Sequence, residues 1–84
     1  MRNFEVQWNP DAEDLLATLY MRVSDPNTVW PAQYRADRRL EQQPRDHGFE
    51  LSEGLWQIIE PPLKIFYEID DATRLVIVTH VQLI

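Results

Sequence analysis

The apolar residues change their spacing part-way along the chain, and this change constrains the fold more than any other feature. Between residues 10 and 42 they recur every three or four positions, as on one face of a helix. From residue 55 to 83 they largely alternate with polar residues, as in strands of a sheet. Helices followed by strands predict an α+β fold, one mainly antiparallel sheet with two helices packed on one face. The 84 residues allow a single domain, 1–84.

The first half predicts a strand and two helices. Residues 4–8 alternate, and Asn9 and Pro10 suit the start of a helix, the first as its N-cap. This helix has one apolar stripe, formed by Leu15, Leu16, Leu19, Tyr20 and Val23. A break at 24–27 separates it from a second helix, which we expect to begin at residue 27 or 28 and to end near 42, before Pro44. One face of the second helix has Val29, Gln33, Ala36 and Leu40.

The second half predicts three strands after a loop at 44–54. We expect strands at 55–60, 63–69 and 74–83, separated by Pro61 with Pro62 and by a turn at 70–73. The last strand is apolar on both faces from residue 75 to 78, which favours an internal position in the sheet. The predicted order is β-α-α-β-β-β.

The composition excludes several classes of protein. There is no cysteine, so disulfides, thiolate metal sites and a cysteine nucleophile are excluded. No apolar run is long enough for a membrane helix, and the N-terminus lacks the pattern of a signal peptide. We therefore expect a cytoplasmic protein without a metal or cofactor. The net charge of −6 argues against a general nucleic-acid binder.

One stretch of the chain, residues 32–47, is positive. Its arginine side chains suit phosphate or carboxylate groups and are candidates for contacts with nucleic acid or an acidic partner. The alternative, which we favour from the residues alone, is a solvated helix face with local pairs to nearby acidic residues. The four arginines are Arg35, Arg38, Arg39 and Arg45.

Lys64, His80 and Tyr67 are the other candidate site residues. Lys64, the one lysine, lies on the strand face opposite Leu63 and could stabilise a phosphate; the alternative is a strand lysine that faces solvent. His80 could act as a general acid or base, although packing against the sheet is the commoner role at such a position. Tyr67 shares a strand face with apolar residues, which favours the core.

The three tryptophans, Trp8, Trp30 and Trp56, are expected to anchor the core or its rim.

Residues 54–81, GLWQIIEPPLKIFYEIDDATRLVIVTHV, resemble the C-terminal sheet of the RelE/ParE superfamily of toxins from toxin–antitoxin systems. The opening FEVQWNPDAEDLLATL is similar to the family's first strand and acidic, leucine-rich helix. ADRRLEQQP, followed by Gly48, is similar to the end of its second helix and the loop after it. The resemblance extends over nearly the whole chain and depends on the order of these segments.

The resemblance implies two different activities. RelE-like members are ribosome-dependent endoribonucleases that cut mRNA without a metal, by attack of the ribose 2′-hydroxyl on the adjacent phosphate. This reaction needs a base, an acid and cations beside the phosphate. ParE-like members instead bind and inhibit DNA gyrase. In both groups a cognate antitoxin protein wraps the toxin and inactivates it.

Transfer of the family's site residues is incomplete. Lys64 lies where RelE-like nucleases commonly have an arginine that holds phosphate, and Tyr67 matches the tyrosine of the same strand. His80 matches a His-Val/Ile pair of the family. Trp56 stands where many members have a basic residue. The family's late histidine corresponds to Leu83, and Gln82 stands where many members have arginine.

Three interpretations follow from the resemblance: a nuclease with an eroded site, a toxin that binds a protein target, or a non-toxic relative. Convergence of Lys64, His80 and Arg45 on the open sheet face would favour the nuclease, whereas a neutral, apolar face would favour protein binding. Such a face, with Phe66, Trp56, Val76 or Val78 on it depending on register, also predicts association into a homodimer.

Overall fold

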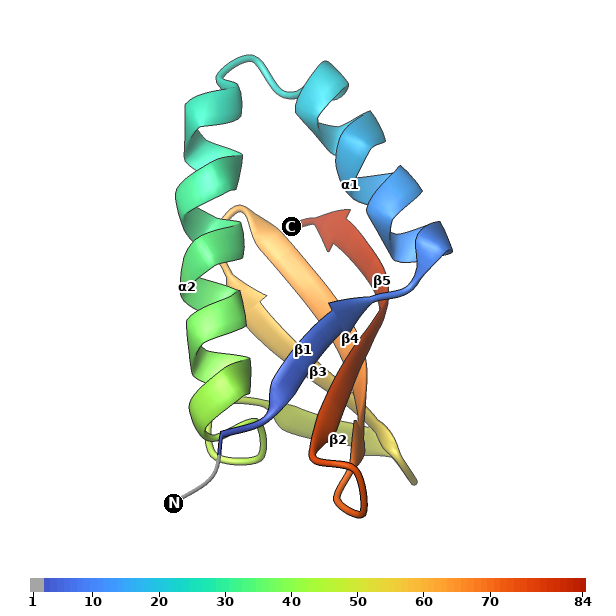
Figure 1. Ribbon diagram of the computed structural model, residues 1–84. Helices are drawn as coiled ribbons and strands as arrows, with labels where there is room; N and C mark the ends of the chain where they lie inside the picture. The colour runs from blue at the N-terminus through green and yellow to red at the C-terminus, as the bar shows by residue number, and fades with distance from the viewer. Residues whose placement is uncertain (1–2) are drawn as a thin grey trace.

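The computed structural model describes residues 3–84 as one sheet with two helices on the same side of it (Figure 1). The chain forms β1 (Glu5–Trp8), α1 (Pro10–Arg22), a short 3₁₀ helix (Pro26–Thr28), α2 (Val29–Gln42), β2 (Phe49–Ser52), β3 (Leu55–Glu60), β4 (Leu63–Asp70) and β5 (Leu75–Leu83). The predicted α+β class and both helices are confirmed. None of the helices within residues 3–84 is long and apolar enough to cross a membrane.

The sheet has five strands in the order β1-β5-β4-β3-β2. β1 runs parallel to β5, and the other neighbours are antiparallel. β5 is therefore internal, as its two apolar faces predict. The pairing of Glu60 with Leu63 closes the β3–β4 hairpin around the two prolines, as expected.

Several boundaries predicted from the sequence are wrong. Residues 26–28 form the 3₁₀ helix, so α2 begins at Val29 and not at residue 27 or 28, and β4 extends one residue past its predicted end, to Asp70. The predicted loop at 44–54 contains β2, whose four residues are all exposed and which forms by pairing along β3, without an apolar face of its own. The last strand begins at Leu75 and not at residue 74, because Arg74 has a φ of 56° and its N–H donates to the carbonyl of Asp71. Arg74 thus belongs to the turn.

The core lies between the helices and the sheet face that they cover. In α2 the inward residues follow the helical repeat, and they pack on alternate residues of β3, β4 and β5. The buried apolar side chains are Phe4, Ala12, Leu16, Val29, Ala32, Ala36, Leu40, Ile58, Leu63, Ile65, Tyr67, Val76, Val78 and Val81. Gln33, expected on the inward face of α2, is half-buried, and Ala32 is buried on that face in its place. Trp30, expected as an anchor, is instead exposed.

A bulge in β5 shifts the alternation of its side chains. Phe66 pairs with His80, but the next residue, Tyr67, pairs with Val78, so Thr79 has no partner in β4. The Thr79 hydroxyl donates to the carbonyl of Phe66 at 3.5 Å. An extra residue in one strand reverses the faces of everything after it.

Candidate functional site on the open face of the sheet

The face of the sheet away from the helices carries Lys64 and His80. In β4, the residues between the buried Leu63, Ile65 and Tyr67 point to this open face, and Lys64 is the first of them. His80 pairs with Phe66, and Lys64 pairs with Gln82, so the lysine and the histidine are diagonal neighbours on adjacent strands. The structure therefore brings two predicted site residues to one surface.

On this surface, Lys64 and His80 both lie beside the ring of Phe66. The rings of Phe66 and His80 meet edge to face with centroids 5.4 Å apart, and the Lys64 Nζ lies 5.7 Å from the Phe66 centroid. The His80 Nε2 lies 3.2 Å from the Gln82 Oε1. A shallow pocket of about 290 Å³ opens here, lined by Leu55, Phe66, Thr79, His80 and Gln82. This pocket offers more apolar than polar surface to a ligand.

The open face of the sheet does not carry a net positive charge. By register, the open-face positions of β1, β3, β4 and β5 within residues 3–84 include one lysine or arginine, Lys64. Glu5 and Glu68 are exposed on the same side, and apolar residues such as Ile59 of β3 and Ile77 of β5 share this face. A polyanion such as RNA would therefore meet one permanent positive charge on these strands.

Tyr67 lies on the covered face, opposite Lys64 and His80. It is buried, and its hydroxyl donates to the carbonyl of Pro44 at 2.5 Å. Gly48 leaves the space for this hydroxyl, because a Cβ at that position would come within 1.9 Å of it. Burial raises the pKa of Tyr67 to about 12. The hydroxyl is thus neutral and engaged in a structural hydrogen bond.

Arg35 and Arg39 are bound to a carboxylate that the sequence analysis did not single out. The Arg35 Nε donates to the Glu60 Oε1 at 3.0 Å, and the Arg39 Nη1 lies 2.8 Å from the Glu60 Oε2. The Glu60 side chain is 5% exposed, whereas the two arginines are about half exposed. These arginines join α2 to the end of β3. Arg38, between them, is exposed.

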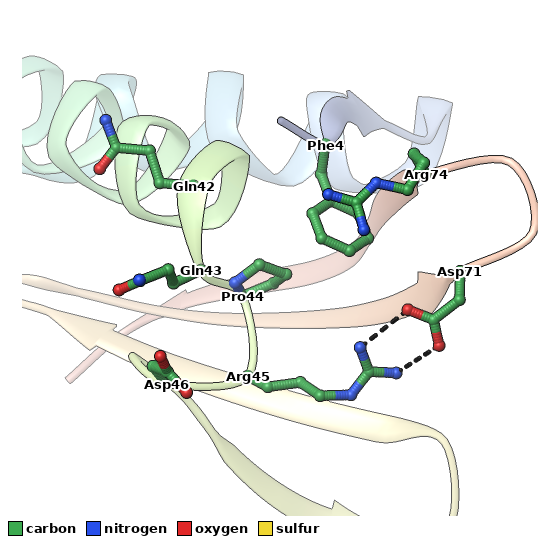
Figure 2. Close-up of a pocket in the computed structure, with 8 residues that line it drawn as sticks. All are labelled: Phe4, Gln42, Gln43, Pro44, Arg45, Asp46, Asp71 and Arg74. Carbon is green, nitrogen blue, oxygen red and sulfur yellow. Dashed lines mark hydrogen bonds and ion pairs between the residues drawn. The ribbon is translucent and has the colours of Figure 1, made fainter. Parts of the chain in front are cut away.

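Arg45 is bound elsewhere, at the far end of α2. Its guanidinium donates two hydrogen bonds to Asp71, at 2.9 and 2.7 Å (Figure 2), and lies over the Trp56 ring. The hydrogen bonds from Arg45 hold the pKa of Asp71 below its ordinary value. The two residues border a hollow of about 270 Å³, whose other lining residues are Phe4, Gln42, Gln43, Pro44, Asp46 and Arg74.

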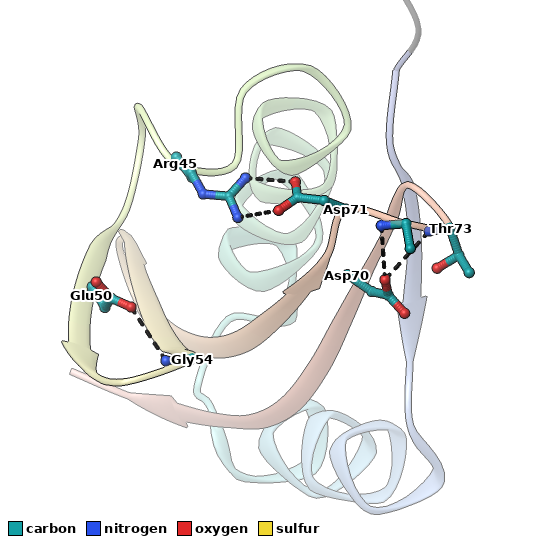
Figure 3. A network of polar contacts seen from close by, with 7 residues as sticks. Arg45, Glu50, Gly54, Asp70, Asp71 and Thr73 are labelled. Carbon is teal, nitrogen blue, oxygen red and sulfur yellow. Dashed lines mark hydrogen bonds and ion pairs between the residues drawn. The ribbon is translucent and has the colours of Figure 1, made fainter.

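The ion pair of Arg45 forms part of the scaffold around the β4–β5 turn (Figure 3). Asp70, the residue before Asp71, accepts hydrogen bonds at its Oδ1 from the backbone N–H groups of Ala72 and Thr73, which fixes this turn. Arg45 thereby ties the segment after α2 to the turn. It does not converge with Lys64 and His80.

Comparisons with known proteins identify the architecture. No family model and no curated protein sequence matches the chain. A chain of the crystal structure of the toxin–antitoxin complex RelBE2 from Mycobacterium tuberculosis superposes with a TM-score of 0.84. The match covers 100% of this chain and 94% of that one, at 21% sequence identity. The chain has the RelE-like fold. The resemblance noted in the sequence is confirmed for the fold.

Sequence reasoning missed several features of this RelE-like fold. Phe66 lies on the open face, but Trp56, Val76 and Val78 lie on the covered face, so the apolar character of the open face comes from other residues. The burial of Glu60 was also missed. Its signal was available, because Glu60 alternates with Ile58 and so falls on the inward face of β3.

Proposed function

We propose that this chain is the toxin component of a toxin–antitoxin pair, that a cognate antitoxin holds it inactive, and that it acts in the cytoplasm by binding a protein. The fold supports the first part, because the RelBE2 neighbour is a toxin–antitoxin complex. The resemblance of the sequence to the RelE/ParE superfamily supports the same role. The surface chemistry supports the mode of action.

The observation that carries the proposal is the placement of the cations. Cleavage through the ribose 2′-hydroxyl needs several positive groups around one phosphate. Here Arg35 and Arg39 bind Glu60, and Arg45 binds Asp71, away from the open face. Lys64 remains beside Phe66 on a surface that otherwise has apolar, acidic and uncharged polar residues beside His80. Such a surface suits a protein partner better than RNA.

A nuclease is the second candidate, and a specific observation favours it. Lys64 and His80 lie diagonally on neighbouring strands, close enough in the fold to act on one phosphate and one leaving oxygen. In that case Lys64 would stabilise charge on the phosphate, and His80 would transfer a proton. Tyr67 has no part in this set, because its hydroxyl is on the other face.

Inducible expression of the chain in a bacterial host tests the proposal. We expect growth arrest that persists in the double variant K64A/H80A and is relieved in I59A/F66A, because the buried core of a protein interface is apolar and depleted of charged residues. Arg38→Ala, a change at an exposed residue of α2, is the matched control and should leave the arrest intact. Purified protein should leave mRNA on ribosomes uncut.

The other outcomes separate the alternatives. If protein synthesis falls first, and if K64A/H80A cleaves mRNA at least about 100 times more slowly than the parent protein, the chain is a nuclease instead. A fall in DNA synthesis first would point to a gyrase-type target, as in the ParE-like branch. Folded protein that causes no arrest would contradict toxicity altogether and leave antitoxin binding as the remaining function.

A further inference from the structure

Two large aromatic side chains are exposed to solvent on the first turns of α2. Trp30 is 62% exposed and Tyr34 is 55% exposed, although the tryptophan was expected to anchor the core or its rim. One helical turn separates them, and their rings stack with centroids 6.0 Å apart and planes within 11° of parallel. Tryptophan and tyrosine are enriched among the residues that dominate binding at protein interfaces, so an exposed pair marks a candidate recognition site.

A carboxylate and an amide complete a slot beside the two rings. The slot has a volume of about 150 Å³ and is lined by Trp30, Gln33, Tyr34 and Asp37. Its polar side is built on three elements, since the Trp8 indole N–H of β1 donates to the Asp37 Oδ1 at 3.0 Å and the Tyr20 hydroxyl of α1 donates to the Gln33 Oε1 at 3.2 Å. The slot is therefore preorganised.

Asp37 has the properties of a receptor for a cation. Burial raises its pKa above the ordinary value, and nearby Glu41 adds to this rise, so a positive ligand would relieve the cost of its charge. Trp8 occupies one carboxylate oxygen, and the second, Oδ2, can accept a further donor. Arg38 follows Asp37, but its exposed side chain is not part of the slot lining.

The net charge of the chain also favours a basic ligand, although the slot lies on α2, largely within the positive stretch 32–47. Two of the arginines there, Arg35 and Arg39, are paired with Glu60. Residues 1–31 have two basic and five acidic residues, a net charge of −3, and the whole chain has −6. Three of the acidic residues, Asp11, Glu13 and Asp14, are exposed on α1, the helix whose Tyr20 supports the slot. A basic segment would gain from this field before any specific contact forms.

We propose that the slot binds an arginine side chain presented by a basic segment of the partner protein, with the guanidinium stacked on Trp30 and Tyr34 and donating to Asp37. A guanidinium suits all three groups, because it stacks flat on aromatic rings and its planar fork matches a carboxylate. This inference rests on the proposed function for the identity of the partner, the antitoxin. The slot itself is a property of this chain.

A defined probe tests the slot without the antitoxin. Two alanine-based helical peptides of about 15 residues are identical except that one has three arginines, spaced four residues apart, and the other has citrulline at those positions. Citrulline keeps the shape and removes the charge. Binding to the full chain is followed by the NMR signals of the three indole N–H groups.

The indole signals report on separate places. We expect saturable shifts of Trp30 and of Trp8, whose N–H bonds to Asp37, with the arginine peptide and none with the citrulline peptide. Trp56 is the internal control, because it lies beside Arg45, past the other end of α2, roughly 20 Å along the helix axis. Asp37→Asn and Tyr34→Ala should each weaken binding about fivefold, and Arg38→Ala should not weaken it.

Three results would overturn the inference. Equal shifts with the citrulline peptide would mean an apolar contact without cation recognition. The absence of a saturable shift at Trp30 would mean that the slot does not bind, provided the Trp8 signal and circular dichroism show an intact fold. Shifts of Trp30 on dilution of the protein alone would assign the face to a second copy of the chain. Because none of these measurements depends on toxicity, the slot and the proposed function can fail separately.

Discussion

The two faces of the sheet use adjacent residues of the same strands for different purposes. On the covered face, Ile65 and Tyr67 are buried against the helices. Glu60, the one charged residue that is buried within residues 3–84, is paired with arginines from α2. On the open face, Lys64 and Phe66 are partly exposed and contact each other. Three of the four arginines in residues 32–47, Arg35, Arg39 and Arg45, therefore serve the scaffold. The open face is left nearly without positive charge.

The largest expected difference in stability between the two faces is at neighbouring residues of β4. We expect Ile65→Ala to lower the free energy of unfolding by about 3 kcal/mol, because it leaves a cavity in the core. Phe66→Ala on the open face should lower it by about 1 kcal/mol or less. Urea denaturation measures both values. Equal losses would mean that the open face is as tightly packed as the covered one.

The arginines of α2 provide a second test. The double variant R35Q/R39Q leaves the buried Glu60 without its partners, and we expect a loss of about 2 kcal/mol, less than for a pair buried on both sides. Arg38→Gln, on the same helix and exposed, should change the unfolding free energy very little. Adding Glu60→Gln to the double variant should restore part of the loss, and no restoration would contradict the charge argument.

Among the buried residues tested, Tyr67 has the smallest expected effect. Tyr67→Phe removes one buried hydrogen bond, which should cost about 1 kcal/mol at neutral pH. In the folded state the pKa of Tyr67 is raised to about 12, above the ordinary value of about 10 in an unfolded chain. The stability due to this difference is present below pH 10 and is lost as the pH rises toward 12.

A pH series of urea denaturation curves checks this sign. The parent protein should lose stability between about pH 10 and 12, and Tyr67→Phe should lose less over the same range. If the unfolding free energy of both proteins declines in parallel, other groups govern the alkaline range, and the raised pKa of Tyr67 is contradicted.

The sequence predicts the elements well where an apolar period is strong, and poorly where pairing alone makes the structure. The helices and the strands β3, β4 and β5 follow from spacing, caps and prolines. β2 does not, because FELS has no buried face and becomes a strand by lying along the edge of β3. The positive φ of Arg74 is likewise set by the turn as a whole.

The candidate site could be predicted in part. Alternation alone separates Lys64 from Tyr67, since neighbouring faces of a strand are distinguishable in the sequence. The partners of the arginines cannot be predicted in this way, because Glu60 and Asp71 lie far along the chain and come near the arginines only in the folded sheet. The stacked pair of Trp30 and Tyr34 was also hidden, because aromatic residues on a helix usually indicate a buried side.

The bulge at Thr79 has a consequence for how this surface can change by insertion and deletion. Val76 and Val78 point inward, and unbroken alternation would turn residue 80 inward as well. The single extra residue instead sends His80 and Gln82 outward and Val81 inward. Loss of Thr79 would remove the bulge and leave both sets on their present faces, whereas loss of the bulge at unchanged chain length would exchange them, with histidine entering the core and valine reaching solvent. Which residues of the β5 tip are exposed thus depends on the bulge as much as on residue type.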